Sequence, residues 1–189
     1  MHPSSPHPAT LSSQLRPLSI RPIVAADWPA VDRIQQAAFA PEVIEELAVF
    51  ASFVALSPAT CLVAVTGHEP IGYLLAHPWL PDDLPPLNTA LDRLPEKSTS
   101  LFIHDLALLP AHRGQGAAGA LVQAVLTAGN SLGLTSASLL SVQDSHSFWQ
   151  RQGFSARPEL APQIAQTVRL FTTIDFLFMT RPSLREVER

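Results

Sequence analysis

The segment from Leu101 to Gly119, LFIHDLALLPAHRGQGAAG, constrains the fold most, because an apolar strand pattern runs into a basic, glycine-rich turn and then into an alanine-rich helix. A helix start leaves about four backbone N–H groups without intrahelical partners, and the helix dipole adds partial positive charge there. Main chain alone can therefore hold a phosphate, provided that small residues let it approach. Arg113 adds a fixed positive charge beside the turn. We predict an anion-binding site at this turn.

Two common phosphate-binding patterns do not account for this turn. The P-loop pattern G-x-x-x-x-G-K-[ST] is absent from the chain. Gly114, Gly116 and Gly119 satisfy G-x-G-x-x-G, but in a dinucleotide-binding unit the strand leads almost directly into the first glycine. Here Pro110 to Arg113 intervene, and too little chain follows for two mononucleotide-binding halves. An ordinary strand–helix–strand unit with glycines for close packing remains possible, but it does not explain Arg113.

The segment resembles motif A of the GNAT superfamily of N-acetyltransferases, [RQ]-x-x-G-x-[GA], whose positions are filled here by Arg113, Gly116 and Ala118. A second landmark of that superfamily is a helix and turn of the form A-x-x-F-Y-x-x-x-G-F. The stretch SHSFWQRQGF, from Ser145 to Phe154, resembles it at a suitable spacing. The resemblance covers roughly Leu18 to Arg181.

This resemblance implies acetyl-CoA as cosubstrate and no metal ion. In the superfamily, amides of the motif A turn hold the pyrophosphate of coenzyme A, and the preceding strand pairs with the pantetheine arm. The positions expected to bind the cosubstrate are therefore Leu106, Ala107, Leu108, Arg113, Gly114, Gln115, Gly116, Ala117, Ala118 and Gly119.

The order of the expected elements predicts a single α/β domain, with a mixed, largely antiparallel sheet flanked by helices. We expect a disordered Pro- and Ser-rich tail over residues 1–17, a GNAT-like domain over 18–182 and a C-terminal tail over 183–189. Within the domain we expect a helix over 30–38, another from Pro41, a hairpin over 60–79, a Pro-rich insertion over 80–100, and helices over 115–132 and 144–152. We also expect strands over 135–142 and 154–158 and a last strand over 172–180.

Charge and composition exclude several classes of partner. Sixteen acidic and twelve basic residues give a net charge of −4, so we expect neither nucleic acid nor an anionic membrane as a partner. The most apolar run, Leu47 to Leu56, is about half of what a bilayer span needs. A single cysteine, Cys61, permits no disulfide within the chain, which fits the reducing cytoplasm. We expect a monomer or homodimer.

Acetyl transfer requires a neutral amine, and an alkyl amine with a pKa near 10.4 must first lose a proton. Strand alternation puts Phe102, His104 and Leu106 on one face and Asp105 on the other. Motif A is most similar here to that of arylalkylamine N-acetyltransferases, which implies that His104 stands where those enzymes carry a histidine implicated in deprotonation. His104 is thus the first candidate base and Asp105 the second. A core histidine and a buried hydrogen-bond acceptor are the respective alternatives.

One position departs from the family pattern. The tyrosine that commonly protonates the departing thiolate is replaced by Trp149, whose indole N–H is not an acid. His146 and Ser147 are candidate substitutes, although both also suit helix capping. Tyr73, the only tyrosine, lies far away in the sequence.

The acceptor is expected to be a small-molecule amine, an arylalkylamine or a polyamine, that attacks acetyl-CoA directly in a ternary complex. Acidic side chains in the two segments that flank the acceptor cleft of GNAT enzymes would favour a cation, unless they form a solvated face. Aromatic side chains could form an apolar wall or belong to the core. Two alternatives remain: an acetyltransferase acting on protein amines, and a non-catalytic acyl-CoA-binding module, which the missing tyrosine supports. The acidic and aromatic candidates are Glu42, Glu45, Glu46, Asp82, Asp83, Phe50, Phe53 and Trp79.

Overall fold

A seven-stranded sheet organises the fold, in the order β1-β2-β3-β4-β5-β7-β6. The computed structural model describes residues 17–142, 144–160, 164 and 176–185. Only β4 and β5 are parallel neighbours, and all other pairs are antiparallel, which confirms the expected mixed sheet. The strands are β1 (Leu18–Pro22), β2 (Cys61–Thr66), β3 (Glu69–Trp79), β4 (Ser100–Leu108), β5 (Ser136–Val142), β6 (Ser155–Ala156) and β7 (Phe176–Arg181).

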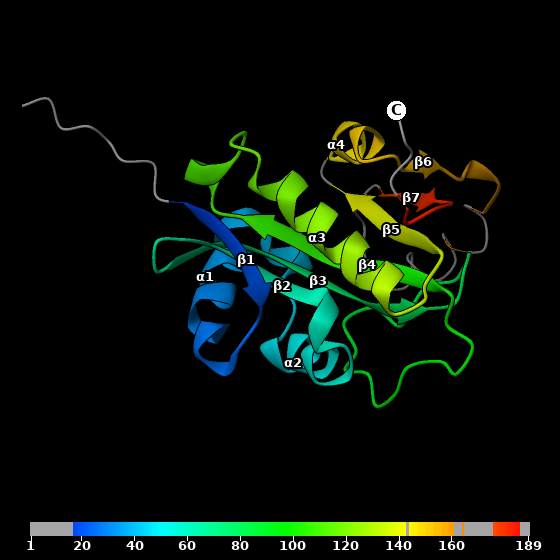
Figure 1. Cartoon of the computed structure of the whole chain (residues 1–189), viewed down its shortest axis with the longest axis horizontal. Helices are drawn as coiled ribbons and strands as arrows, with labels where there is room; N and C mark the ends of the chain where they lie inside the picture. Colours follow the sequence, from blue (N-terminus) through cyan, green and yellow to red (C-terminus); the bar gives the residue numbers. More distant parts are fainter. Residues whose placement is uncertain (1–16, 143, 161–163, 165–175, 186–189) are drawn as a thin grey trace, which may run out of the picture.

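Helices cover both faces of this sheet (Figure 1). On one face lie α1 (Trp28–Ala38) and α2 (Leu47–Leu56), and on the other lie α3 (Ala117–Ser131) and α4 (His146–Arg151). Each long helix buries one set of apolar residues, as in α3, where Leu121, Val122 and Val125 recur at helical spacing and are fully buried. The expected three-layer α/β domain is confirmed.

Helix α2 begins at Leu47 and not at Pro41, as we had expected. Pro41–Val43 form a single 3₁₀ turn, and Glu46 has extended dihedral angles. The cause is Gln35 of α1, whose buried amide satisfies both backbone groups of Glu45. Gln35 Nε2 donates to the Glu45 carbonyl at 3.1 Å, and the Glu45 N–H donates to Gln35 Oε1 at 2.7 Å. This pair of bonds, which we call the Gln35 clamp, holds the loop before α2 against α1.

Strand β4 carries a bulge that changes which way its side chains face. Leu75 of β3 pairs with Asp105 and Ala76 pairs with Ile103, so His104 is the extra residue. Consequently His104 and Asp105 both face the α1/α2 side, where Asp105 bonds Tyr73 and His104 contacts Phe53. Simple alternation, which placed Asp105 on the opposite face from His104 and Leu106 on the same face as His104, was wrong here: Leu106 packs on the α3 side.

The parallel pairing of β4 with β5 ends early. It covers Ser100–Ile103 of β4 and Ser136–Leu139 of β5, so no pairing with β5 follows Ile103. The second half of β4 therefore presents an edge to the gap between the two strands, beside the start of α3.

The packed chain extends past the boundary expected at residue 182. Leu184 is buried against α3, and its N–H donates to the Thr135 carbonyl at 3.1 Å. The expected tail over 1–17, apart from Pro17, lies outside the described residues, as do residues 172–175 of the expected last strand.

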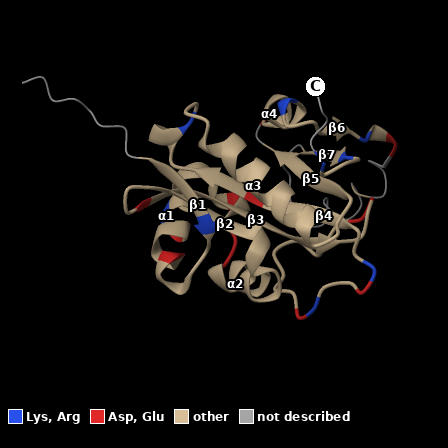
Figure 2. Ribbon diagram, viewed as in Figure 1, with Lys and Arg blue, Asp and Glu red and all other residues tan. Residues whose placement is uncertain are grey.

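Charged positions are spread thinly over the described fold, and most of the ribbon is tan in Figure 2. In the parts of the chain that the structure describes, no helix combines the length and apolar character needed to cross a membrane.

Candidate active site

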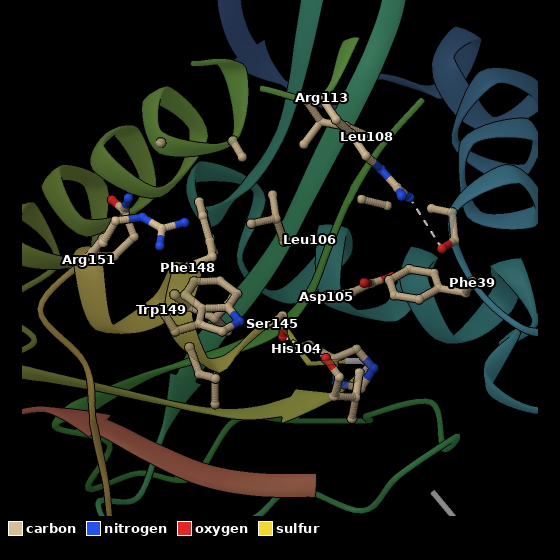
Figure 3. Close-up of a pocket in the computed structure, with 18 of the residues that line it drawn as sticks. Phe39, His104, Asp105, Leu106, Leu108, Arg113, Ser145, Phe148, Trp149 and Arg151 are labelled. Atoms are coloured by element: carbon tan, nitrogen blue, oxygen red, sulfur yellow. Dashed lines mark hydrogen bonds between the residues drawn. The ribbon is translucent and has the colours of Figure 1, made fainter. Parts of the chain in front are cut away.

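A cavity of about 640 Å³ opens between the separated ends of β4 and β5 and reaches the start of α3. Figure 3 shows Arg113 and Phe39 on one side of it, Phe148 and Trp149 on the other, and His104 and Asp105 between them. We call it the cosubstrate cavity. Of the ten positions expected to bind acetyl-CoA it is lined by eight, namely Leu106, Ala107, Leu108, Arg113, Gly114, Gly116, Ala118 and Gly119.

The turn before α3 has the geometry of an anion site. Gly114 and Gly116 have φ of +74° and +89°, and a Cβ at either position would meet no atom within 4 Å. Ala120 makes the first intrahelical bond, to the Gly116 carbonyl at 3.0 Å, so the three amides before it lie ahead of the helical ladder. The open space at the two glycines and the backbone amides that make no helical hydrogen bond are compatible with the pyrophosphate site that the sequence predicts.

Two of the expected cosubstrate positions play other parts. Gln115 is exposed, and its side chain folds back to donate to the Ala111 carbonyl at 2.9 Å. The side chain of Ala117, the first residue of α3, is buried in the core, so only its main chain is available to a phosphate. In contrast, Arg151 of α4 lines the same cavity from the opposite wall and escaped the sequence analysis.

A second cavity of about 200 Å³ adjoins the first, and the two share five wall residues, namely Phe39, His104, Asp105, Leu140 and Val142. We call it the acceptor cavity. Its remaining walls are mostly apolar, with two glutamates at the loop before α2 and Asn88 from the Pro-rich insertion. They are Glu42, Val43, Ile44, Glu45, Leu87, Asn88, Phe102 and Phe176.

His104 is already paired within this site. Its Nε2 lies 3.0 Å from Glu45 Oε2, and its side chain is 4% exposed. Its Nδ1 is buried and has no hydrogen-bond partner among the described residues. The ring packs on Phe53, with centroids 4.5 Å apart, and lies near His77, in which burial lowers the pKa to about 3 and thus keeps the imidazole neutral.

Asp105 is paired with a residue that the sequence analysis set aside. The Tyr73 hydroxyl donates to Asp105 Oδ2 at 2.6 Å, so the only tyrosine lies at the site after all. Burial raises the pKa of Asp105 to about 7, while the Tyr73 bond and His104 act in the opposite direction. Burial and the Asp105 carboxylate likewise raise the pKa of Tyr73 well above 10, which keeps its hydroxyl protonated.

The geometry does not support His146 and Ser147 as substitutes for the missing acid. Both are exposed on α4, and neither lines either cavity. Ser145, one residue earlier, does line the cosubstrate cavity, and its hydroxyl donates to the Val142 carbonyl at 2.7 Å. Trp149 lines the cavity too, and its ring packs against Phe154 with centroids 5.5 Å apart.

The acceptor candidates divide between the cavity and other places. Glu42 and Glu45 line the acceptor cavity, whereas Asp82 pairs at the surface with Arg157 at 3.3 Å. Glu46 and Asp83 line neither cavity. The three aromatic candidates belong to the core: Phe50, Phe53 and Trp79 are each less than a tenth exposed and line neither cavity. Within the described ranges, no three His, Cys, Asp or Glu side chains are grouped so that they could hold a metal ion.

Comparison with known families identifies the family to which this chain belongs. Residues 28–154 match the sequence profile described as the Acetyltransferase (GNAT) family. The chain belongs to this family. It is therefore an acetyl-CoA-dependent acetyltransferase, and the cosubstrate cavity is where its motif A lies. The match identifies the family and does not single out the arylalkylamine branch. A comparison with curated proteins gives no significant match.

Solved structures share the fold of this GNAT chain. Ard1 from Thermoplasma volcanium superposes with a TM-score of 0.65 at 16% identity, covering 89% of this chain and 99% of that one. The ribosomal-protein-S18-alanine N-acetyltransferase from Escherichia coli gives 0.61 at 16% identity, covering 90% and 97%. A GNAT family acetyltransferase from Brucella melitensis, in complex with acetyl-CoA, gives 0.53 at 21% identity, covering 75% and 84%.

The Gln35 clamp leads to a first prediction. Gln35→Met should lower the free energy of unfolding by about 1 kcal/mol, because two partly buried backbone groups of Glu45 lose their partners. The loop that carries Glu45 would also loosen, and we expect KM for the acceptor to rise roughly tenfold, equivalent to about 1.4 kcal/mol. Urea unfolding and steady-state kinetics measure the two effects. Gln36→Met, at an exposed site on the same helix, is the matched control and should change neither quantity.

Proposed function

We propose that this acetyltransferase transfers the acetyl group to a primary amine in a ternary complex, with the amine in the acceptor cavity. The observation that carries the proposal is that the two cavities meet at His104 and Asp105. An amine entering one cavity would therefore approach a thioester held in the other, next to two groups capable of proton transfer. Acetyl-CoA supplies the activated carbonyl carbon, and the chain supplies orientation and a path for the proton.

The acceptor cavity favours an amine attached to one apolar group. Glu42, Glu45 and Asp105 provide negative charge for an ammonium ion, while aliphatic and aromatic side chains form the other walls. A polyamine would place further cationic centres against these apolar walls, which is costly. The small volume suits a single side chain or a compact aromatic group.

We propose the α-amine of a peptide or protein, with an apolar first residue, as the preferred acceptor. Its pKa of about 7.7 to 8.0 makes deprotonation easier than for an alkyl amine near 10.4. The neighbouring solved structures support this choice over an arylalkylamine, since one is described as an alanine N-acetyltransferase of a ribosomal protein. A small arylalkylamine is the second candidate, supported by the aromatic Phe102 and Phe176 in the cavity wall.

An acceptor panel tests the proposal. Release of free thiol from acetyl-CoA is followed with short peptides that differ in their first residue, with arylalkylamines and with polyamines. We expect peptides that begin with an apolar residue to give the highest kcat/KM, and N-terminally blocked copies of the same peptides to give none.

Two results would contradict this proposal in different ways. A higher kcat/KM for arylalkylamines than for all peptides would show that the preferred acceptor is an arylalkylamine, while acetyl transfer to an amine would still hold. Absence of turnover with every amine, together with tight acetyl-CoA binding, would favour the non-catalytic acyl-CoA-binding module.

A further inference from the structure

His104 does not present a free nitrogen to the acceptor. A carboxylate only accepts hydrogen bonds, so the His104 Nε2 that faces Glu45 Oε2 at 3.0 Å carries the proton. The lone pair then lies on Nδ1, which is buried and has no partner among the described residues. In this arrangement the imidazole donates to Glu45 and offers the amine no acceptor.

Asp105 lies at the same junction as His104 and supplies the proton acceptor that His104 lacks. The bulge in β4 turns its carboxyl group toward the α1/α2 side, and Asp105 lines both cavities at their junction. One carboxyl oxygen is held by the Tyr73 hydroxyl at 2.6 Å. The facing charged or titratable groups are Tyr73 from β3, Glu45 from the loop before α2, His104 from β4 and Asp32 from α1, which acts on Tyr73.

From this geometry we propose that Asp105 accepts the proton of the amine, that Tyr73 positions its carboxylate, and that Glu45, held by the His104 N–H, binds the incoming ammonium group. The inference rests on the proposed function, since it assigns the proton acceptor for the same acetyl transfer. A carboxyl group with a pKa of about 7 is matched to this task, because near neutral pH it is partly ionised and basic enough to remove a proton.

The protons balance as follows. The acceptor enters as an ammonium ion with three N–H bonds, and the Asp105 carboxylate takes the first proton. The free amine forms the C–N bond to the acetyl carbonyl carbon, and the C–S bond breaks. The departing thiolate takes the second proton, the amide keeps the third, and Asp105 returns its proton to water in the cavity.

The test compares pH profiles of kcat/KM for three variants of the full chain. The wild-type profile should rise with pH through about 7, since the ionised form of Asp105 is the active one. Asp105→Asn should lower kcat by roughly 100-fold or more and flatten this rise. Tyr73→Phe should move the midpoint upward by about one pH unit, because the lost O–H bond favoured the carboxylate. His104→Gln should keep the rise and increase KM for the acceptor.

Controls separate this inference from the proposed function. Two acceptors whose amines differ in pKa should give the same midpoint, because it belongs to the enzyme. Acetyl-CoA affinity, measured by calorimetry, should stay near wild type in all three variants. If Asp105→Asn loses this affinity, the inference is tested by the pH midpoint of Tyr73→Phe instead, and an unchanged midpoint would contradict it. A pH rise that persists in Asp105→Asn and disappears in His104→Gln would overturn the inference while acetyl transfer stands. A wild-type protein that acetylates no amine would overturn both.

Discussion

Replacing Gly116 with aspartate should weaken acetyl-CoA binding by at least about 100-fold. The new carboxylate would project into the open space at the start of α3, where a Cβ meets no atom within 4 Å and where the pyrophosphate is expected. Two like charges about 4 Å apart repel by about 4 kcal/mol near a protein surface, which exceeds the roughly 2.7 kcal/mol that a 100-fold change requires. Isothermal titration calorimetry with acetyl-CoA measures the effect.

Strain at this position needs its own control, because Gly116 has a φ of +89°. Any side chain there costs roughly 1 to 2 kcal/mol of stability. Gly133 has a similar φ of +82° and equally open surroundings, but it lies beyond the other end of α3. Gly116→Ala and Gly133→Ala should therefore lower the melting temperature by similar amounts and change acetyl-CoA affinity little. Unchanged affinity in Gly116→Asp would refute the anion site.

Asp105→Asn should stabilise the protein, and more strongly at pH 8 than at pH 5. The folded-state pKa of about 7 lies above the model-compound value of 3.8, so the folded chain holds this proton more tightly than the unfolded chain does. The free energy of unfolding of the wild type therefore falls as pH rises from about 4 to about 7. The asparagine of the variant does not titrate, so the variant does not show this fall. With about 1.4 kcal/mol for each pKa unit, the gain at pH 8 should exceed the gain at pH 5 by on the order of 2 kcal/mol.

Urea unfolding at the two pH values measures this difference. Asp82→Asn is a suitable control because Asp82 is exposed, with 48% of its side chain accessible, and it should show no such dependence on pH. Equal gains at pH 5 and pH 8 would show that Asp105 titrates normally. A stability cost at a proton-transfer residue is also expected physically, since a buried acid suits catalysis better than it suits folding.

Features that depend on local chain geometry could be predicted from the order of the amino acids. Glycines, small residues and a following helical pattern suffice to predict an anion site before α3, because its expected donors are backbone amides of neighbouring residues. Apolar periodicity likewise predicted the helices and strands, and their order predicted the mixed sheet. Eight of the ten expected cosubstrate positions consequently line the cavity.

The set of side chains that line the acceptor cavity could not be predicted in this way, because it depends on long-range packing. A one-residue bulge in β4 turned Asp105 toward Tyr73, and no alternation rule could locate that bulge without its partner strand. Glu45 lies beside His104 because the buried Gln35 of α1 bonds the Glu45 backbone, so that α2 begins only at Leu47. These contacts join residues far apart in the chain, so they depend on how the helices and strands pack and not on local preference.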